Sequence, residues 1–119
     1  MTSKFASLAL DAVDVRRLAD FWTRALDYRI EEEADGIISL APVDGYGPPI
    51  DILPVPEHKS VKNRLHLDLR ADGCTGEEEV QRLLALGAVL ADVGQEPDVT
   101  WTVLADPEGN EFCILGTSA

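Results

Sequence analysis

The sequence has few basic residues, few cysteines and no long apolar run. Lysine and arginine total 10 against 22 aspartates and glutamates, and the formal charge of −12 argues against nucleic acid or an anionic membrane as a partner. Two cysteines, Cys74 and Cys113, are too few for the disulfide framework of a small secreted protein. No apolar run approaches the roughly 18 residues of a membrane span, and Asp11 and Arg16 interrupt the region where a signal peptide would be apolar. We therefore expect a soluble cytoplasmic protein with no membrane partner.

The clearest strand signal is residues 63–70, where polar and apolar residues alternate without a break. This is the period of a strand with one face on a core. The residues of one face are Leu65, Leu67 and Leu69, and those of the other are Arg64, His66, Asp68 and Arg70. So polar a face suits either open solvent or a wet cavity. We expect the cavity, with the leucines packed against helices.

Apolar residues at helical spacing predict a helix over residues 15–26, with Asp14 as its N-cap. A second helix is predicted from a capping box of Thr75 and Glu78 up to a C-cap at Gly87. Besides residues 63–70, the predicted strands cover residues 5–10, 28–33, 36–41, 50–53, 88–92, 100–104 and 111–115. Residues 55–62 contain proline and no apolar periodicity, so they are expected to be a linker.

The second half of the chain repeats the first with a period of about 60 residues. Residues 7–10 align with residues 66–69, and residues 50–53 align with residues 112–115. The order of elements and the apolar spacing agree between the halves. We therefore predict an α+β fold of two tandem βαβββ modules in one domain of 119 residues. Module 1 spans about residues 1–54, and module 2 about residues 63–119.

Three segments resemble the glyoxalase/bleomycin-resistance family, the vicinal oxygen chelate superfamily. They are residues 18–22 (LADFW) with Leu26, residues 62–69 (KNRLHLDL) and residues 101–113 (WTVLADPEGNEFC). The strand followed by Asp-Pro-Glu-Gly-Asn is the most specific of them. The resemblance covers almost the whole chain and implies two modules whose sheets curl into a cup, with helices outside and a ligand cavity inside. It also implies a homodimer, since such a cup leaves sheet edges to cover.

The resemblance further implies a divalent metal on four inward positions, which in this chain are Ser7, Asp51, His66 and Cys113. The family's usual ligands there are His or Gln on the first strands and Glu on the last, and only His66 matches. Ser7 offers a neutral hydroxyl, and Cys113 must lose a proton to bind. We therefore expect no cofactor and no catalytic metal. The alternative is a divalent cation, zinc, nickel or iron, with a thiol favouring zinc.

The candidate ligand-binding residues are Arg64, His66, Asp68 and Trp101. Asp68 can orient His66, which is then a candidate general base, or the polar set can be a structural ladder of ion pairs. Trp101 is expected either to stack on a flat ligand or to pack in the core. Arginine on an acidic protein favours a ligand that bears a carboxylate or a similar acceptor.

Two functions remain open from the sequence. The first is a binder of a small organic molecule in the cup, without a catalytic metal, as in the resistance proteins that the chain resembles. The second is a metal-dependent lyase, isomerase or dioxygenase of the glyoxalase type. This scaffold hosts many chemistries, so the resemblance alone does not choose between them.

Overall fold

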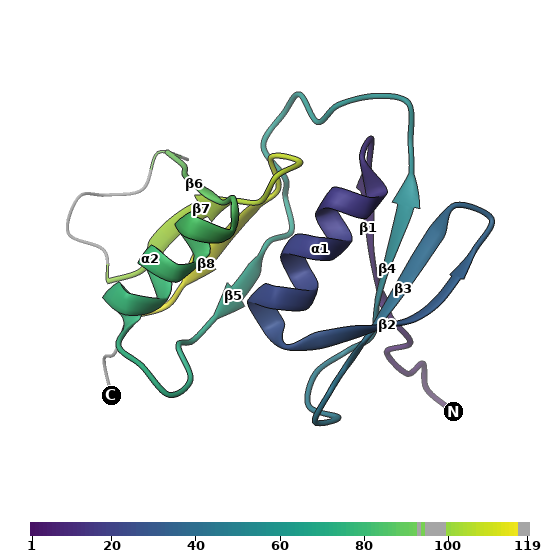
Figure 1. Ribbon diagram of the computed structural model, residues 1–119, viewed down its shortest axis with the longest axis horizontal. Helices are drawn as coiled ribbons and strands as arrows, with labels where there is room; N and C mark the ends of the chain where they lie inside the picture. Colours follow the sequence, from purple (N-terminus) through teal and green to yellow (C-terminus); the bar gives the residue numbers. More distant parts are fainter. Residues whose placement is uncertain (93, 95–99, 117–119) are drawn as a thin grey trace. The chain divides into compact units, whose positions relative to one another are not determined.

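The computed structural model describes residues 1–92, 94 and 100–116, and the chain divides into two compact units (Figure 1). Unit 1 comprises Met1–His58 and unit 2 comprises Lys59–Ala119, so the division falls within the proline-containing segment 55–62. In the described ranges, each unit contains one four-stranded mixed sheet and one helix. The α+β class and the two βαβββ modules predicted from the sequence are confirmed.

The two modules have the same topology. Module 1 contains β1 (Leu8–Ala12), α1 (Val15–Leu26), β2 (Tyr28–Ala34), β3 (Ile37–Pro42) and β4 (Ile50–Pro54), in the sheet order β1-β4-β3-β2. Module 2 contains β5 (Leu67–Leu69), α2 (Gly76–Leu86), β6 (Val89–Leu90), β7 (Thr102–Ala105) and β8 (Glu111–Ile114), in the order β5-β8-β7-β6. In each sheet the first strand pairs in parallel with the last, and the other pairs are antiparallel.

The strand registers match the internal repeat residue by residue. In module 1, Leu8 pairs with Ile50 and Ala9 with Asp51. In module 2, the equivalent residues are also paired: Leu67 with Phe112, and Asp68 with Cys113. The alignment made from the sequence is therefore confirmed at these positions.

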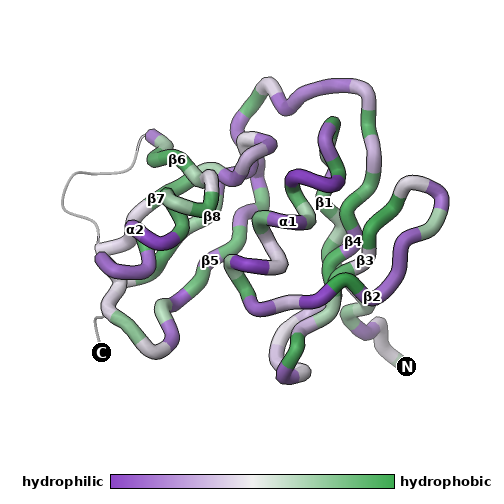
Figure 2. The backbone as a smooth tube through the Cα atoms, viewed as in Figure 1, coloured by the Kyte–Doolittle hydropathy of each residue, from purple (hydrophilic) through white to green (hydrophobic). Residues whose placement is uncertain are grey.

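The core of module 1 is the apolar face of α1 packed on its sheet. The buried residues of this helix are Leu18, Ala19, Phe21, Trp22 and Ala25. The Asp14 side chain accepts a hydrogen bond from the Arg17 backbone N–H, which confirms the predicted N-cap. Figure 2 shows that β2 is hydrophilic along most of its length, whereas β3 is largely hydrophobic. Strand β3 is therefore largely buried in the core, whereas the edge strand β2 is mostly exposed.

The turn between β2 and β3 contains two residues with left-handed backbone conformations. Asp35 and Gly36 have φ values of 56° and 81°. Two consecutive positive φ values are those of a two-residue type I′ hairpin, which suits Asp-Gly because glycine pays no steric penalty there. The turn predicted from this dipeptide is confirmed.

Helix α2 begins with the predicted capping box. The Thr75 hydroxyl accepts from the Glu78 backbone N–H at 3.1 Å, and the Glu78 carboxylate accepts from the Thr75 N–H at 2.9 Å. These two bonds satisfy backbone donors that a helix start leaves unpaired, and they lower the pKa of Glu78. Among the described residues, neither helix is long and apolar enough to cross a membrane.

Thr75→Ala should therefore destabilise the protein by about 1 kcal/mol in a urea titration, because one end of the box is lost. Thr23→Ala is the matched control, since Thr23 lies inside α1 and its hydroxyl donates to the Asp20 carbonyl of the same helix. That substitution raises helix propensity and should be neutral or slightly stabilising. Equal destabilisation by both changes would contradict the capping role.

The strand predicted over residues 63–70 is shorter than expected. It covers only Leu67–Leu69, and Leu65 is 88% exposed instead of packing under a helix. At Asn63, where the strand was predicted to begin, the backbone N–H donates to the Glu111 carboxylate and the side-chain amide donates to Asn110. Two side chains thus hydrogen-bond to Asn63 in place of the backbone of a neighbouring strand. Smaller shifts affect the predicted strand 5–10, found at Leu8–Ala12, and the strand at 100–104, which begins only at Thr102.

Candidate functional site

The chemistry-bearing residues of module 2 gather around one cavity of about 460 Å³. Its lining residues are Lys62, His66, Asp68, Gly94, Trp101, Val103, Glu111, Cys113 and Leu115. A larger hollow of about 820 Å³ lies between the start of α2 and strands β7 and β8, but Glu77 is the sole charged residue among those found to line it. The smaller cavity is therefore the candidate site.

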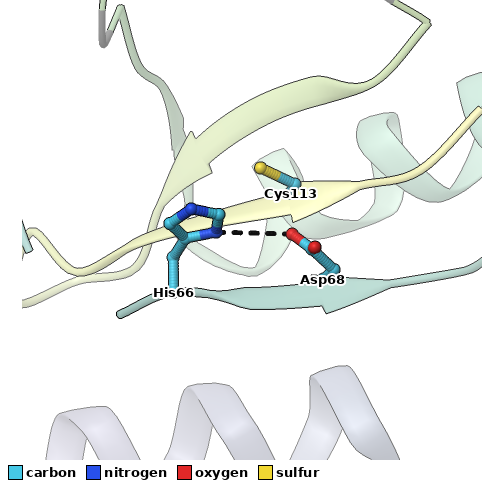
Figure 3. A group of neighbouring side chains, drawn as sticks. All are labelled: His66, Asp68 and Cys113. Atoms are coloured by element: carbon cyan, nitrogen blue, oxygen red, sulfur yellow. Dashed lines mark ion pairs between the residues drawn. The ribbon is translucent and has the colours of Figure 1, made fainter. Parts of the chain in front are cut away.

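His66 and Asp68 form a pair at the edge strand β5. His66 Nδ1 lies 3.3 Å from Asp68 Oδ1, and both side chains are about half-exposed. Figure 3 shows the imidazole and the carboxylate pointing toward each other, with Cys113 on the neighbouring strand. Residues 66 and 68 share a face because successive side chains of a strand alternate. A carboxylate beside Nδ1 orients the imidazole ring.

Cys113 lies opposite Asp68 in the β5–β8 pairing and is only 6% exposed. Burial raises the pKa of its thiol above the ordinary value of 9.0, and the negative charge of Asp68 raises that pKa further, while Lys62 opposes both effects. An unliganded Cys113 is therefore a neutral thiol at pH 7. It is not an activated nucleophile.

Glu111 is a site residue that the sequence analysis did not identify. It is 9% exposed, and its carboxylate lies 2.9 Å from Lys59 Nζ while accepting from the Asn63 N–H at 3.1 Å. Burial acts to raise the pKa of Glu111, but Lys59 and the backbone donors outweigh it and hold that pKa below 4.5. The available signal was its position two residues before Cys113, which puts it on the same strand face.

The predicted ligand-binding residues are only partly brought together. His66, Asp68 and Trp101 line the cavity, and Trp101 is 41% exposed. Arg64 is exposed and is not among the lining residues; Lys62, which the sequence analysis did not select, supplies the cation there. Trp22, by contrast, is 1% exposed in the core of module 1.

The remaining two positions implied by the resemblance lie in module 1. The Ser7 hydroxyl donates to Asp51 Oδ2 at 3.2 Å. This pair occupies the positions equivalent to His66 and Cys113, since Leu8 pairs with Ile50 as Leu67 pairs with Phe112. Ser7 and Asp51 thus satisfy each other, and no imidazole or thiol accompanies them at these positions.

Comparison with known proteins identifies the family. A family model described as "Glyoxalase-like domain" matches residues 7–115 of the chain. The chain belongs to the glyoxalase-like domain family. No curated protein matches this glyoxalase-like domain at a significant level.

Solved structures of the glyoxalase/bleomycin-resistance superfamily share the fold of this glyoxalase-like domain. The fosfomycin resistance protein FosX of Mesorhizobium loti has a TM-score of 0.73 and 13% identity over 99% of this chain and 94% of its own. A glyoxalase/bleomycin resistance protein/dioxygenase family enzyme of Burkholderia phytofirmans PsJN has a TM-score of 0.73 and 19% identity over 98% and 100%. FosX of Listeria monocytogenes, in a mutant complexed with Mn(II) and 1S,2S-dihydroxypropylphosphonic acid, has a TM-score of 0.73 and 17% identity over 98% and 93%.

The donor atoms of this glyoxalase-like domain do not suit a hard cation such as Mn(II). Within module 2, the ligand atoms of His66, Asp68 and Cys113 all lie within 4.8 Å of one another. They offer one nitrogen, one oxygen and one sulfur, whereas hard cations prefer oxygen-rich sites. Nitrogen and thiolate ligands are those of zinc. The residues present therefore fit a thiophilic divalent cation better than manganese.

Proposed function

We infer that this glyoxalase-like domain binds a small organic anion in the cavity of module 2. The observation that supports the proposal is the cavity itself, about 460 Å³ in volume, with Trp101, Val103 and Leu115 among its lining residues and a few convergent polar groups. Small-molecule sites have this size and this mixture of apolar walls and sparse polar anchors.

The cavity lining includes one cation, Lys62, that can meet an anionic ligand. Asp68 is paired with His66, and Glu111 is paired with Lys59. In the described part of the chain, Lys62 lies against no carboxylate and donates only to the Asn63 carbonyl at 3.3 Å. Lys62 is thus a lining cation free to meet a carboxylate or phosphonate, and His66 can donate to or accept from the same ligand. Trp101 offers an indole surface for a planar group.

The test uses benzoate as the probe, with benzylamine as its cationic counterpart, and Trp101 fluorescence as the readout. Benzoate should bind and benzylamine should not. Lys62→Gln should weaken benzoate binding by about 10-fold or more, the effect of losing one hydrogen bond to a charged group. His66→Ala should weaken it to a similar extent.

Arg64→Gln is the matched control, because it removes the same charge two residues away from a side chain outside the cavity lining. It should change affinity by less than about 2-fold, since exposed charges act weakly through solvent. Equal losses from Lys62→Gln and Arg64→Gln would mean general electrostatic attraction and would contradict the proposed site.

A second candidate function is a metal-dependent lyase, isomerase or dioxygenase of the glyoxalase type. The specific observation in its favour is the proximity of Asp68 to His66 and Cys113, which adds a third donor to the two expected from the sequence in this module. Turnover that requires a divalent cation would favour it over binding alone. The sequence led us to expect binding without a metal. If that expectation holds, benzoate should bind with the same affinity when a chelator is present.

Homodimer formation, a cytoplasmic location and the absence of nucleic-acid partners stay predictions. Support for self-association comes from β6, an edge strand whose Val89 and Leu90 are 58% and 65% exposed. Apolar side chains on an open strand edge favour pairing with another chain.

A further inference from the structure

Three different kinds of metal ligand lie together in module 2. An imidazole nitrogen of His66, a carboxylate oxygen of Asp68 and the Cys113 sulfur all lie within 4.8 Å of one another (Figure 3). The pairing of Asp68 with Cys113 across β5 and β8 fixes two of them on facing residues. Because the cluster has mixed donors and lines a cavity, it differs from a chance group of surface carboxylates.

The spacing of these atoms is close to that of a tetrahedral zinc site. With zinc–ligand bonds of about 2.0–2.3 Å, neighbouring ligand atoms stand roughly 3.3–3.6 Å apart. His66 Nδ1 and Asp68 Oδ1 are already separated by 3.3 Å. Because the Cys113 sulfur also lies within 4.8 Å of the other two ligand atoms, a displacement of no more than roughly 1.5 Å completes three corners.

We propose that this cluster binds one Zn²⁺ through His66 Nδ1, Asp68 Oδ1 and Cys113 Sγ, with a fourth coordination position directed to the cavity. Binding releases the proton of the Cys113 thiol and any proton on Nδ1, because both atoms must donate lone pairs. The resulting thiolate and the Asp68 carboxylate neutralise the two positive charges of the ion. Water or an organic anion fills the fourth position, and only this last point rests on the proposed function.

This assignment departs from the four positions implied by the family resemblance. His66 and Cys113 are two of those positions, but Asp68 is not. Its equivalent in module 1 is Ala9, which is not one of the four either. The three ligands all come from one module, and Ser7 and Asp51 take no part. A thiolate in place of a carboxylate also changes the metal preference, from hard cations toward zinc.

The first experiment titrates the chelator-stripped full chain with Zn²⁺, Mn²⁺ and Co²⁺ in the absence of any organic ligand. One Zn²⁺ should bind per chain, and Co²⁺ should give a thiolate-to-cobalt charge-transfer absorption in the near ultraviolet. Zinc normally binds more tightly than manganese at any site, so the ratio in the unmodified protein does not decide the matter. Absence of stoichiometric zinc or of the cobalt absorption would overturn the proposal.

Two cysteine variants locate the sulfur ligand. Cys113→Ser should abolish the cobalt absorption and weaken Zn²⁺ binding far more than Mn²⁺ binding, because only the softer ion depends on sulfur. Cys74→Ser is the matched control and should change neither, since the exposed Cys74 lies near Glu79, outside the cluster. An absorption lost with Cys74 and kept without Cys113 would refute the assignment.

Two carboxylate variants separate this site from the family's four positions. Asp68→Asn should weaken Zn²⁺ binding by at least about 10-fold, the low end of what even an outer hydrogen-bond partner of a metal site contributes. Asp51→Asn should leave it within about 2-fold. The reverse order would assign the metal to the family positions. Asp68 is half-exposed, so its amide variant should fold, which circular dichroism checks.

The zinc titration and the benzoate titration fail independently. Benzoate binding to chelator-stripped protein without zinc binding would retain the proposed function and remove the metal site. Zinc binding with no benzoate affinity, in either the stripped or the zinc-loaded protein, would retain the metal site and contradict the proposed function.

Discussion

Trp22→Ala should lower the free energy of unfolding of module 1 by about 3–5 kcal/mol, the usual cost of deleting a large buried aromatic side chain. Trp22 is 1% exposed and packs edge-on against Phe21, with ring centroids 5.0 Å apart and planes at 88°. The deletion loses both the burial of the indole and its contacts, and it leaves a cavity that the strands of a small sheet fill poorly. In urea the unfolding midpoint should fall by roughly 1–5 M.

Trp101→Ala is the control with the same chemical change at a different burial. Trp101 is 41% exposed at the cavity of module 2, so its removal should cost much less stability. Circular dichroism monitors unfolding in both variants, and the remaining tryptophan of each reports on the other unit by fluorescence. Equal destabilisation by the two substitutions would contradict the assignment of Trp22 to the core and Trp101 to the site.

Glu111→Gln should destabilise module 2 by about 1–3 kcal/mol at pH 7, the penalty for leaving a largely buried partner unsatisfied. The carboxylate lies 2.9 Å from Lys59 Nζ, and the side chains of Glu111 and Lys59 are 9% and 21% exposed. The glutamine keeps the shape of the side chain and an acceptor for the Asn63 N–H, but it leaves the Lys59 ammonium without its charge partner.

The same substitution should also reduce the loss of folding stability that occurs as the pH falls into the acid range. Burial would raise the pKa of Glu111, but Lys59 and the backbone donors lower it below its ordinary value of 4.5. A carboxyl whose pKa is lowered on folding stabilises the folded state above its unfolded pKa, and this contribution is lost as the pH falls through the folded pKa. The difference between wild type and Glu111→Gln should therefore be full near pH 7 and shrink below about pH 4.

Chemical denaturation at several pH values measures this difference. Glu57→Gln is the matched control, since Glu57 is exposed and should change stability by less than about 0.5 kcal/mol at any pH. A Glu111→Gln penalty that persists undiminished at low pH would mean that the charge of Glu111 is not its source.

The sequence by itself determined the local structure and the repeat. Helix α1 with its Asp14 cap, the Thr75–Glu78 box and the Asp35-Gly36 turn all depend on residues within a few positions of one another. The duplication was also readable, because equivalent strands in the two modules keep the same apolar spacing. These features follow from hydrogen bonds and side-chain periods that the chain expresses locally.

The sequence pattern failed where a strand needs a partner. Alternation over residues 63–70 is the same whether or not a neighbour pairs with the backbone, so it predicted a long strand with Leu65 buried. Asn63 instead bonds Glu111 and Asn110, which lie 48 and 47 residues further along the chain. No local signal distinguishes these two outcomes.

Only the tertiary structure decided the composition of the site. His66 and Asp68 could be placed on one face from the sequence, but their meeting with Cys113 depends on the parallel register of β5 and β8, two strands separated by a helix and two further strands. The tertiary structure also places Glu111 and Lys62 at the cavity and leaves Arg64 outside its lining. Side-chain alternation predicts which face a residue occupies. The identity of its neighbours depends on long-range pairing, whose free energy comes from the packing of the whole module rather than from any single segment.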